Sequence, residues 1–457
     1  MSIEKNRVGF ITLGCAKNQV DSEYMLADLQ ASGFSLTERL DEAEVIVINT
    51  CGFILAAREE SIEVILDAAR YKEQGSCRVL AVVGCLAQRY ETELKKELPE
   101  VDLFLGVGGS RQRMLSARLR DCLGIAKQSQ AVGCPGHGVT GYSRLVDTAW
   151  QGWAYLKISE GCDNRCSYCA IPLIRGPLVS RPPGELAQEA GYLESLGVME
   201  LNLIAQDLTA YGTDRPGGDY GTLAGLLELL LTETSIPWIR LLYAHPAHLD
   251  EEVLELMAGR ERVLPYLDLP VQHASNRVLG RMGRGTTKDD LSRLIGRARQ
   301  VVDSLVLRTT VLVGYPGETE ADFEELLEFV ETARFDRLGA FAFSREEGTA
   351  AAEEPGSVTE EEAGRRVETL LELQRQISAG LNEGRIGTVM PVLVERPVDP
   401  EEAMSGQYSW VGRSAGHAPE VDGWVYLSGP GLCEPGSIVR VRIEDAGDYD
   451  LFGSLIS

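Results

Sequence analysis

Runs of consecutive apolar residues recur along the first 105 positions, and each is followed by a segment with helical spacing. Buried strands are expected at residues 8–13, 44–49, 78–83 and 101–105. Among the intervening segments, Ile62, Ile65, Leu66 and Ala69 have the i, i+3, i+4, i+7 spacing of one apolar helix face. Strands that alternate with helices predict a parallel, doubly wound sheet, because each crossover helix returns the chain in the same direction.

The same alternation returns after residue 150 and continues for about six units. Strands are expected at residues 153–158, 199–204, 238–243, 265–269, 305–312 and 337–343, with amphipathic segments between them. Six parallel strands with helices outside predict an incomplete TIM-like (βα)6 barrel. In such a fold the functional residues lie at the carboxyl ends of the strands.

The last part of the chain has a different pattern. Residues 355–383 have the spacing of a long helix, and after residue 385 short strands alternate with Gly and Pro turns. We expect strands at residues 389–394, 421–427 and 438–443, which predict a small antiparallel β-barrel. The predicted domains are residues 1–130, a Gly- and Pro-rich linker over 131–150, residues 151–384 and residues 385–457.

Composition narrows the class of protein. A chain of 457 residues is too long for a single domain with one hydrophobic core, so several domains are expected. The formal net charge is −25. An acidic surface disfavours phosphate backbones and favours basic partners, although it can also serve solubility alone. No apolar run reaches the ~20 residues of a membrane span, and residues 1–7 lack a signal-peptide pattern, so a cytoplasmic protein with no membrane partner is expected. The ten cysteines are then expected to be ligands or buried thiols rather than disulfides.

Three cysteines of the first domain have the same position relative to a predicted strand. Cys15, Cys51 and Cys85 each come two residues after a predicted strand, and two of them follow glycine directly. Because the carboxyl ends of parallel strands share one edge of the sheet, the topology should gather these thiols. Three unrelated buried cysteines remain the alternative. The repetition favours a metal site with three thiolates.

A second set of three thiols lies within eight residues, after the first strand of the central domain. Cys162, Cys166 and Cys169 have Cys-x3-Cys-x2-Cys spacing. Fe–S clusters normally take four thiolates, so a loop with three leaves one iron open for another ligand. An open zinc site or a simple electron-transfer centre is the alternative. Cys134 and His137 in the linker could also bind a metal, but no further ligands lie nearby in the sequence.

Polar residues follow the other predicted barrel strands. They are Gln206 and Asp207, His245, Gln272 and His273, and the segment 314–318, which ends in Glu318. A single His or Gln at a strand end is more often structural, but four such strand ends, with the cysteine loop at a fifth, indicate a binding site at one face. The remaining cysteines, Cys77, Cys122, Cys134 and Cys433, are interpreted as ordinary thiols.

The motif Cys-x3-Cys-x2-Cys after a first barrel strand resembles the radical S-adenosylmethionine (SAM) superfamily. With the upstream cysteines, and with residues 159–161 and 175–176 flanking the loop, the whole chain resembles the methylthiotransferases. The resemblance implies two 4Fe–4S clusters, SAM as cofactor and a C-terminal TRAM domain. Cys162, Cys166 and Cys169 would hold the cluster that binds SAM. Cys15, Cys51 and Cys85 would hold the cluster that delivers sulfur.

Two features separate the possible substrates. Residues 385–457 contain five Arg, no Lys and eleven acidic residues, a net charge of −6 that suits a basic protein better than RNA. Residues 175–181, Arg-Gly-Pro-Leu-Val-Ser-Arg, lack the Glu of the tRNA-modifying relatives, and this form, with residues 418–423 and 449–453, is similar to the RimO type. That type methylthiolates the β-carbon of an aspartate in a small basic protein, the twelfth of the small ribosomal subunit. Methylthiolation of a tRNA adenosine is the alternative, and a non-enzymatic Fe–S carrier is the alternative of another class.

The resemblance further implies that a radical formed from SAM removes hydrogen from the β-carbon, that cluster-held sulfur captures the carbon, and that a second SAM supplies methyl. The two cofactors would then face one cavity. Gln206, Gln272, Glu318 and Arg181 are the predicted cofactor- or substrate-orienting residues, and no catalytic residue is assigned. An electron donor of unknown identity is required, and a monomer is expected.

Overall fold

The computed structural model describes residues 6–108, 114–125, 144–215, 217, 220–402, 406–429 and 433–456. The chain forms two compact units. The N-terminal unit comprises Met1–Asp147 with Gly161–Asp163 and Ala170–Pro177, and the C-terminal unit comprises Thr148–Glu160, Asn164–Cys169 and Leu178–Ser457. The division into three domains and a linker is finer than these units and stays a prediction.

The N-terminal unit is built on the expected parallel sheet. Its strands are β1 (Arg7–Thr12), β2 (Ser35–Leu36), β3 (Val45–Thr50), β4 (Val79–Gly84) and β5 (Leu103–Leu105). They lie in the order β2-β1-β3-β4-β5, with every pair parallel. The order reverses between β1 and β3, and in this topology ligands bind beyond the carboxyl ends of the strands at that point.

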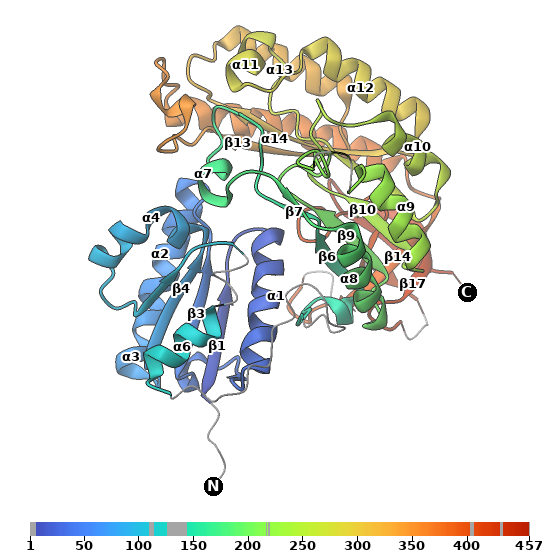
Figure 1. Ribbon diagram of the computed structural model, residues 1–457. Coiled ribbons are helices and arrows are strands. Elements are labelled where there is room, and N and C mark those ends of the chain that lie inside the picture. The colour runs from blue at the N-terminus through green and yellow to red at the C-terminus, as the bar shows by residue number, and fades with distance from the viewer. Residues whose placement is uncertain are drawn as a thin grey trace. The chain divides into compact units, whose positions relative to one another are not determined.

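Helices cover both faces of this sheet (Figure 1). The helices of this unit are α1 (Ala16–Ala31), α2 (Leu55–Ala69), α3 (Tyr71–Gln74), α4 (Cys85–Glu97), α6 (Leu115–Leu123), the short α7 (Ile171–Arg175), which packs beside Cys85, and the 3-10 turn η1 (Leu40–Glu42). Alternate strand residues face opposite sides: Ile46 and Ile48 pack with α2 and α4, whereas Val45 and Val47 pack with α1 and α6. In α2, Ile65 is buried but Leu66 is 45% exposed, so the predicted apolar face is narrower than its spacing suggested.

The C-terminal unit contains a six-stranded parallel sheet. Its strands are β6 (Trp153–Lys157), β9 (Glu200–Ile204), β10 (Trp238–Leu241), β11 (Val263–Asp268), β12 (Val306–Val313) and β13 (Arg337–Ala342). They lie in sequence order from β6 to β13, which are the two edges of the sheet. A sheet wound in one direction keeps its crossover helices on one side, so the predicted partial (βα)6 barrel is confirmed.

Seven helices belong to this unit in the described residues, and four of them begin at a threonine cap. The seven are α8 (Pro183–Ser195), α9 (Leu223–Glu233), α10 (Glu251–Gly259), α11 (Asn276–Met282), α12 (Lys288–Val301), α13 (Glu320–Ala333) and α14 (Glu360–Glu383). The hydroxyls of Thr222, Thr287, Thr319 and Thr359 accept the backbone N–H three residues on, which satisfies a donor left free by the first turn. The short pieces η2 (Ala149–Gln151), β7 (Ser159–Glu160), β8 (Val179–Ser180) and η4 (Ala350–Glu353) complete the connections.

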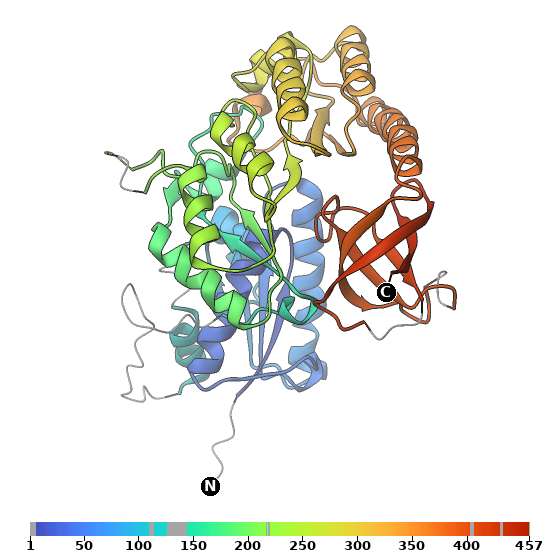
Figure 2. The same cartoon turned by 90° about the vertical axis from the view of Figure 1, so that its right-hand side faces the viewer.

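A closed five-stranded barrel follows α14 (Figure 2). Its strands are β14 (Val389–Pro397), β15 (Trp410–Ser414), β16 (Val425–Ser428), β17 (Ile438–Ala446) and β18 (Leu451–Leu455). The prediction of a wholly antiparallel barrel is wrong in one respect, because β16 and β18 pair in parallel. An odd number of strands cannot alternate direction all the way around a closed barrel. The interior is apolar and includes Cys433.

One loop of the small barrel contacts the polar face of the six-stranded sheet. The strand registers place Tyr155, Asn202 and Arg240 side by side. The hydroxyl of Tyr155 donates to Glu420 at 2.9 Å, and Arg240 donates to the carbonyl of Ala415 at 2.6 Å. The loop between β15 and β16 therefore covers polar groups that would otherwise be open to water.

Within the described residues, no helix is long and apolar enough to cross a membrane.

Candidate functional site

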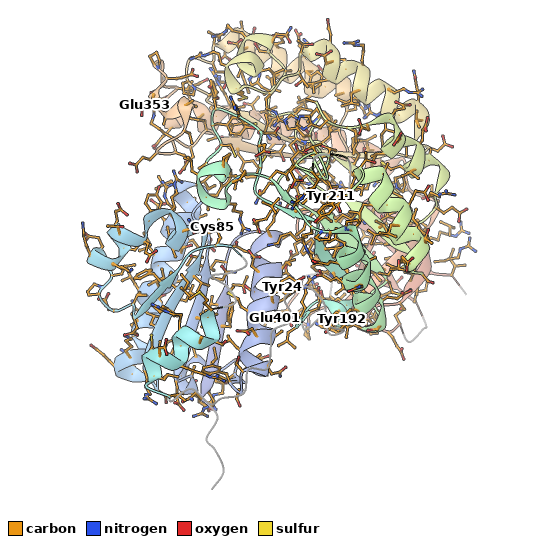
Figure 3. The ribbon with its side chains drawn as sticks, in the orientation of Figure 1. Tyr24, Cys85, Tyr192, Tyr211, Glu353 and Glu401 are labelled. Carbon is orange, nitrogen blue, oxygen red and sulfur yellow. The ribbon has the colours of Figure 1, made fainter. Side chains whose placement is uncertain are left out.

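The three cysteines of the N-terminal unit follow three neighbouring strands. Cys15 is the N-cap of α1 after β1, Cys51 comes directly after β3, and Cys85 is the first residue of α4 after β4. Because β1, β3 and β4 are adjacent in the sheet, the topology brings these thiols to one edge, at the point where the strand order reverses. Figure 3 labels Cys85 at this edge.

The turns that carry these cysteines approach one another closely. Gly14 has φ +91°, and a Cβ at this residue would lie 2.8 Å from the Cβ of Cys51. The side-chain amide of Asn18 donates to the carbonyls of Leu13 and Thr50, each at 3.0 Å, and so joins the turns after β1 and β3. Only glycine fits at residue 14, because any larger residue would collide with Cys51.

Burial perturbs two of these three thiols, Cys51 and Cys85. Burial raises the pKa of Cys85 to about 12, although the nearby Arg175 cation opposes the shift. Burial also raises the pKa of Cys51. All three thiols are free, and Cys15 is exposed, which leaves a route of access. Three unpaired thiols at one edge fit an Fe–S cluster, whose binding would displace their protons.

The second cysteine set lies in the connection between β7 and α7. Cys162 is buried in the N-terminal unit, and its N–H donates to the carbonyl of Gly176 at 3.1 Å. Cys166 and Cys169 are half-buried in the C-terminal unit, and the N–H of Cys169 donates to the carbonyl of Cys166 at 3.1 Å. None of the three is in a disulfide, and three cysteines within eight residues of sequence match the ligand count of a cluster that keeps one iron open.

Side chains from distant strands hold the loop of the C-terminal unit in place. Asn164 donates to Asp207 Oδ2 at 2.7 Å, after strand β9. The hydroxyls of Ser167 and Tyr315 lie 2.9 Å apart. Gly283 has φ +70°, and the carbonyl of Arg165 would lie 2.9 Å from a Cβ at this position. The loop is therefore fixed by partners at the ends of several strands.

The polar residues after β9 and β10 form one cluster, Asp207, His245 and His248, whose ligand atoms lie within 4.8 Å of one another. Burial alone would raise the pKa of Asp207, but hydrogen bonds from His248, Thr209 and Asn164 lower it to about 2. Burial lowers the pKa of His245 to about 3, so this side chain is neutral. Its Nδ1 accepts the N–H of Ala247, so its proton is on Nε2 and that atom is not a free metal ligand.

Two of the predicted orienting residues have free amides. Gln206 and Gln272 are half-buried, and neither side chain has a hydrogen-bond partner within the described parts of the chain. The backbone of Gln272 has φ +69°, a conformation that non-glycine residues rarely adopt. Its N–H and C=O bond to Thr310 and Leu312 of β12, which holds the residue at the strand end. Their assignment to a ligand stays a prediction.

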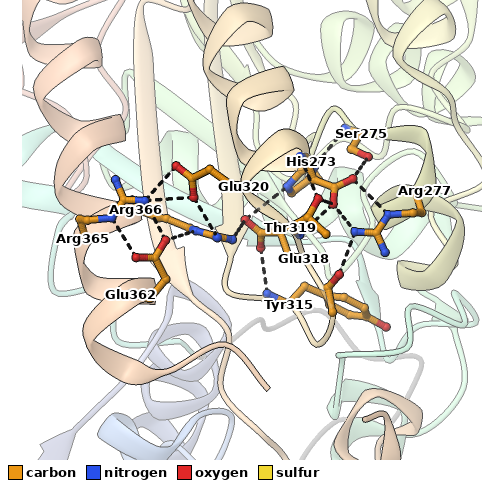
Figure 4. A network of polar contacts seen from close by, with 12 residues as sticks. His273, Ser275, Arg277, Tyr315, Glu318, Thr319, Glu320, Glu362, Arg365 and Arg366 are labelled. Carbon is orange, nitrogen blue, oxygen red and sulfur yellow. Dashed lines mark hydrogen bonds and ion pairs between the residues drawn. The ribbon is translucent and has the colours of Figure 1, made fainter. Parts of the chain in front are cut away.

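The other two predicted residues already have charged partners. The carboxylate of Glu318 accepts from Arg366 at 2.7 Å and from the N–H of Tyr315 at 3.0 Å (Figure 4). Arg181 pairs with Glu189 at 2.7 Å and donates to the carbonyl of Lys157 at 2.9 Å. The first contacts join the segment after β12 to α14, and the second join the segment after β8 to α8 and β6. A role for either residue in cofactor binding stays a prediction.

The surface of the small barrel carries aromatic rings beside carboxylates. Tyr426 and Phe452 stack with ring centroids 5.4 Å apart, and Tyr408 lies 5.4 Å from Phe452. Burial, Asp445 and Glu444 raise the pKa of Tyr408, which places these acids next to the rings. Acidic and aromatic groups together suit cationic side chains.

Comparison with known proteins places these features in a family. Residues 7–106 match the uncharacterized protein family UPF0004, residues 156–330 match the radical SAM superfamily, and residues 386–456 match the TRAM domain. The ribosomal protein uS12 methylthiotransferase RimO of Desulforudis audaxviator is 45% identical over 454 residues, covering 99% of this chain and 98% of that protein. The same-named protein of Syntrophotalea carbinolica is 44% identical over 455 residues, covering 100% and 98%. The chain belongs to the RimO methylthiotransferase family.

Solved structures agree with this fold. TsrM, a radical SAM methyltransferase from Kitasatospora setae solved with cobalamin and a [4Fe-4S] cluster, has a TM-score of 0.54 at 13% identity, covering 76% of this chain and 74% of that one. A second structure of TsrM, with tryptophan and a SAM analogue, has a TM-score of 0.52 at 15% identity, covering 74% and 73%. The expected fold, with its radical SAM core and TRAM barrel, is confirmed. Membership of the radical SAM superfamily supports SAM and an Fe–S centre as cofactors of this protein.

Several residues around the RimO-family site were not predicted from the sequence. Asn18, Arg175, Arg284 and His248 contact the cysteine sets or the Asp207 cluster. Arg175 was noted only as part of a motif, and His248 carries a weak signal in the spacing Ala-His-Pro-Ala-His after β10. Cys77 and Cys433 lie in apolar cores and Cys122 is exposed, whereas Cys134 and His137 lie outside the described residues.

Proposed function

We propose that this protein adds a methylthio group to the β-carbon of an aspartate in ribosomal protein uS12, using two 4Fe–4S clusters and SAM. Cys15, Cys51 and Cys85 would hold one cluster, and Cys162, Cys166 and Cys169 would hold the other. The observation that supports this most directly is the first set, which a single-cluster radical enzyme would not require. Relatives that share nearly the full length are named for this activity.

When bound, SAM and the clusters supply the radical, the sulfur and the methyl group, and the chain supplies position and protection. Asn18 and Gly14 set the spacing of the thiols beyond β1 and β3. Asn164 and Ser167 tie the second loop to Asp207 and Tyr315 at the strand ends. The free amides of Gln206 and Gln272 are the groups that we assign to orienting SAM or the substrate.

The TRAM barrel supports a protein rather than a nucleic acid as substrate. Its net charge of −6 repels phosphate, and RNA binding depends heavily on cationic contacts. Aromatic rings beside Glu444 and Asp445 suit the lysines and arginines of a small basic protein. We place the enzyme in the cytoplasm, as a monomer that receives electrons from a separate donor.

The test uses anaerobically reconstituted full-length protein. Iron and sulfide analysis is expected to give about eight irons per chain, and C15A/C51A/C85A is expected to retain about four. The enzyme is then incubated with a reductant and SAM and with free uS12, assembled small subunits or tRNA. Mass spectrometry should find the methylthio group on an aspartate of uS12. Modified tRNA with unmodified uS12 would overturn the choice of substrate.

A matched control separates methylthiolation from other SAM chemistry. C15A/C51A/C85A should still form 5′-deoxyadenosine from SAM but should leave uS12 without the methylthio group. C162A/C166A/C169A should form neither product. If the wild-type protein forms no 5′-deoxyadenosine, a non-enzymatic Fe–S carrier becomes the better description.

A further inference from the structure

In each of the two cysteine sets, a buried arginine donates a hydrogen bond to a cysteine sulfur. In the N-terminal unit, Nη2 of Arg175 lies 3.4 Å from Sγ of Cys85. In the C-terminal unit, Nη1 of Arg284 lies 3.6 Å from Sγ of Cys166. Arg175 is 7% exposed and Arg284 is 5% exposed, so solvent screens neither charge effectively.

The two arginines differ in what else surrounds them. Nη1 and Nη2 of Arg175 both lie 3.2 Å from Asp21, and Nη2 donates to Asn18 at 2.6 Å, so a carboxylate balances this cation. Arg284 donates to the carbonyl of Pro270 at 2.6 Å, and its Nε has no hydrogen-bond partner. Among the described residues, no carboxylate lies within ion-pair distance of Arg284.

A buried cation without a counter-charge is unfavourable, so its position calls for an anionic neighbour. A protonated cysteine would not supply that charge. A cluster ligated by thiolates does, because its sulfurs are negative and its reduced form is more negative than its oxidised form. Charge and hydrogen bonds at the sulfurs are among the factors that set the reduction potential of such a cluster.

We propose that Arg284 and Arg175 are positioning residues that each raise the reduction potential of one cluster, Arg284 acting on the cluster of the Cys162 loop and Arg175 on that of Cys85. The inference rests on the proposed function, because it requires a cluster on each cysteine set. A cation beside the sulfur stabilises the reduced form. Asp21 cancels part of the field of Arg175, so the effect of Arg284 is the larger one.

The test measures each cluster alone, by EPR-monitored redox titration without SAM. C15A/C51A/C85A holds only the loop cluster, and C162A/C166A/C169A holds only the other. In the first background, Arg284→Met should shift the one-electron equilibrium at least tenfold toward the oxidised form, which is about 59 mV. Arg284→Lys keeps the positive charge, so the potential of its loop cluster should stay close to the wild-type value. In the second background, Arg175→Met should shift the potential in the same direction by less.

The second background also provides the matched control, because Arg284→Met should leave the potential of the Cys85 cluster unchanged. A purely structural Arg284 would lower thermal stability or iron content without moving the potential of the loop cluster, and that result overturns the inference. If Arg284→Met loses its iron, Arg284→Gln is titrated instead, and an unchanged potential there has the same meaning. About four irons in the wild-type protein would contradict the proposed function itself, whatever the Arg284 variants show.

Discussion

Arg413 of the TRAM barrel and Glu200 of the radical SAM core form an ion pair with no solvent exposure, with Nη2 and Oε2 2.6 Å apart. Glu200 also accepts from Arg240 at 2.6 Å, and Arg413 also pairs with Glu395. The four side chains link β9, β10, β14 and β15. Each charge in this group has a partner of opposite sign, which is the condition under which buried charges are tolerated.

Removal of Arg413 should therefore destabilise the C-terminal unit strongly. Arg413→Met leaves Glu395 without its partner and Glu200 with only one, and breaking a buried pair in this way costs about 3–5 kcal/mol. Arg440→Met is the matched control, because Arg440 is exposed on β17, and a change of at most about 0.5 kcal/mol is expected there. Urea unfolding checks both, and equal midpoints for the two variants would contradict the prediction.

The buried His417 should make stability depend on pH. Burial, with Arg337 and Arg385 nearby, holds the pKa of His417 well below its usual value, and its Nε2 lies 2.8 Å from Nη2 of Arg337. Below about pH 6.5 the unfolded chain binds a proton at this residue and the folded protein does not. The free energy of unfolding should then fall by about 1.4 kcal/mol per pH unit from this residue alone.

His417→Gln removes the titrating group and is the comparison that isolates this slope. The variant should be less stable than the wild type at pH 8, because hydrogen bonds to Ser414 and Arg337 are weakened. The difference between the two proteins should narrow as the pH falls from 6.5 to 5. Parallel stability curves across this range would show that His417 does not control the slope.

Gly14 should be essential for the first cysteine set. Gly14→Ala introduces a Cβ that meets Cys51 at 2.8 Å, so the turns after β1 and β3 must separate. We expect iron content after reconstitution to fall from about eight to about four per chain. Gly33→Ala is the matched control, since Gly33 has φ +90° and nothing within 4 Å of its Cβ position. Similar iron loss in both variants would attribute the effect to backbone strain alone.

The acidic face of the TRAM barrel should contribute to binding of the basic substrate. E444Q/D445N removes two charges beside Tyr408, so association with uS12 should slow and its salt dependence should weaken. E324Q/E328Q removes two exposed charges on α13 and serves as the control of equal net charge. Surface plasmon resonance at two salt concentrations checks this. An equal decrease in the rate of association with uS12 in both variants would indicate a general effect of net charge rather than a docking face.

Local patterns in the sequence were sufficient to predict much of the architecture. Strand and helix alternation predicted both parallel sheets, because burial on both faces requires continuous apolar runs. The positions of Cys15, Cys51 and Cys85 after three strands predicted that they would meet, since parallel strands end at one edge. The Cys162 loop was recognisable because its three ligands are close in sequence.

Tertiary structure decided what lies around these thiols. Arg175 is 90 residues from Cys85 and Arg284 is 118 residues from Cys166, and no periodicity relates such pairs. Residues 35–36, 410–414 and 451–455 were not predicted as strands, because short segments acquire strand geometry from their neighbours. Spacing along a chain determines which face a side chain occupies, but only the folded arrangement determines which distant charge it meets there. Arg413 and Glu200, 213 residues apart, are such a pair.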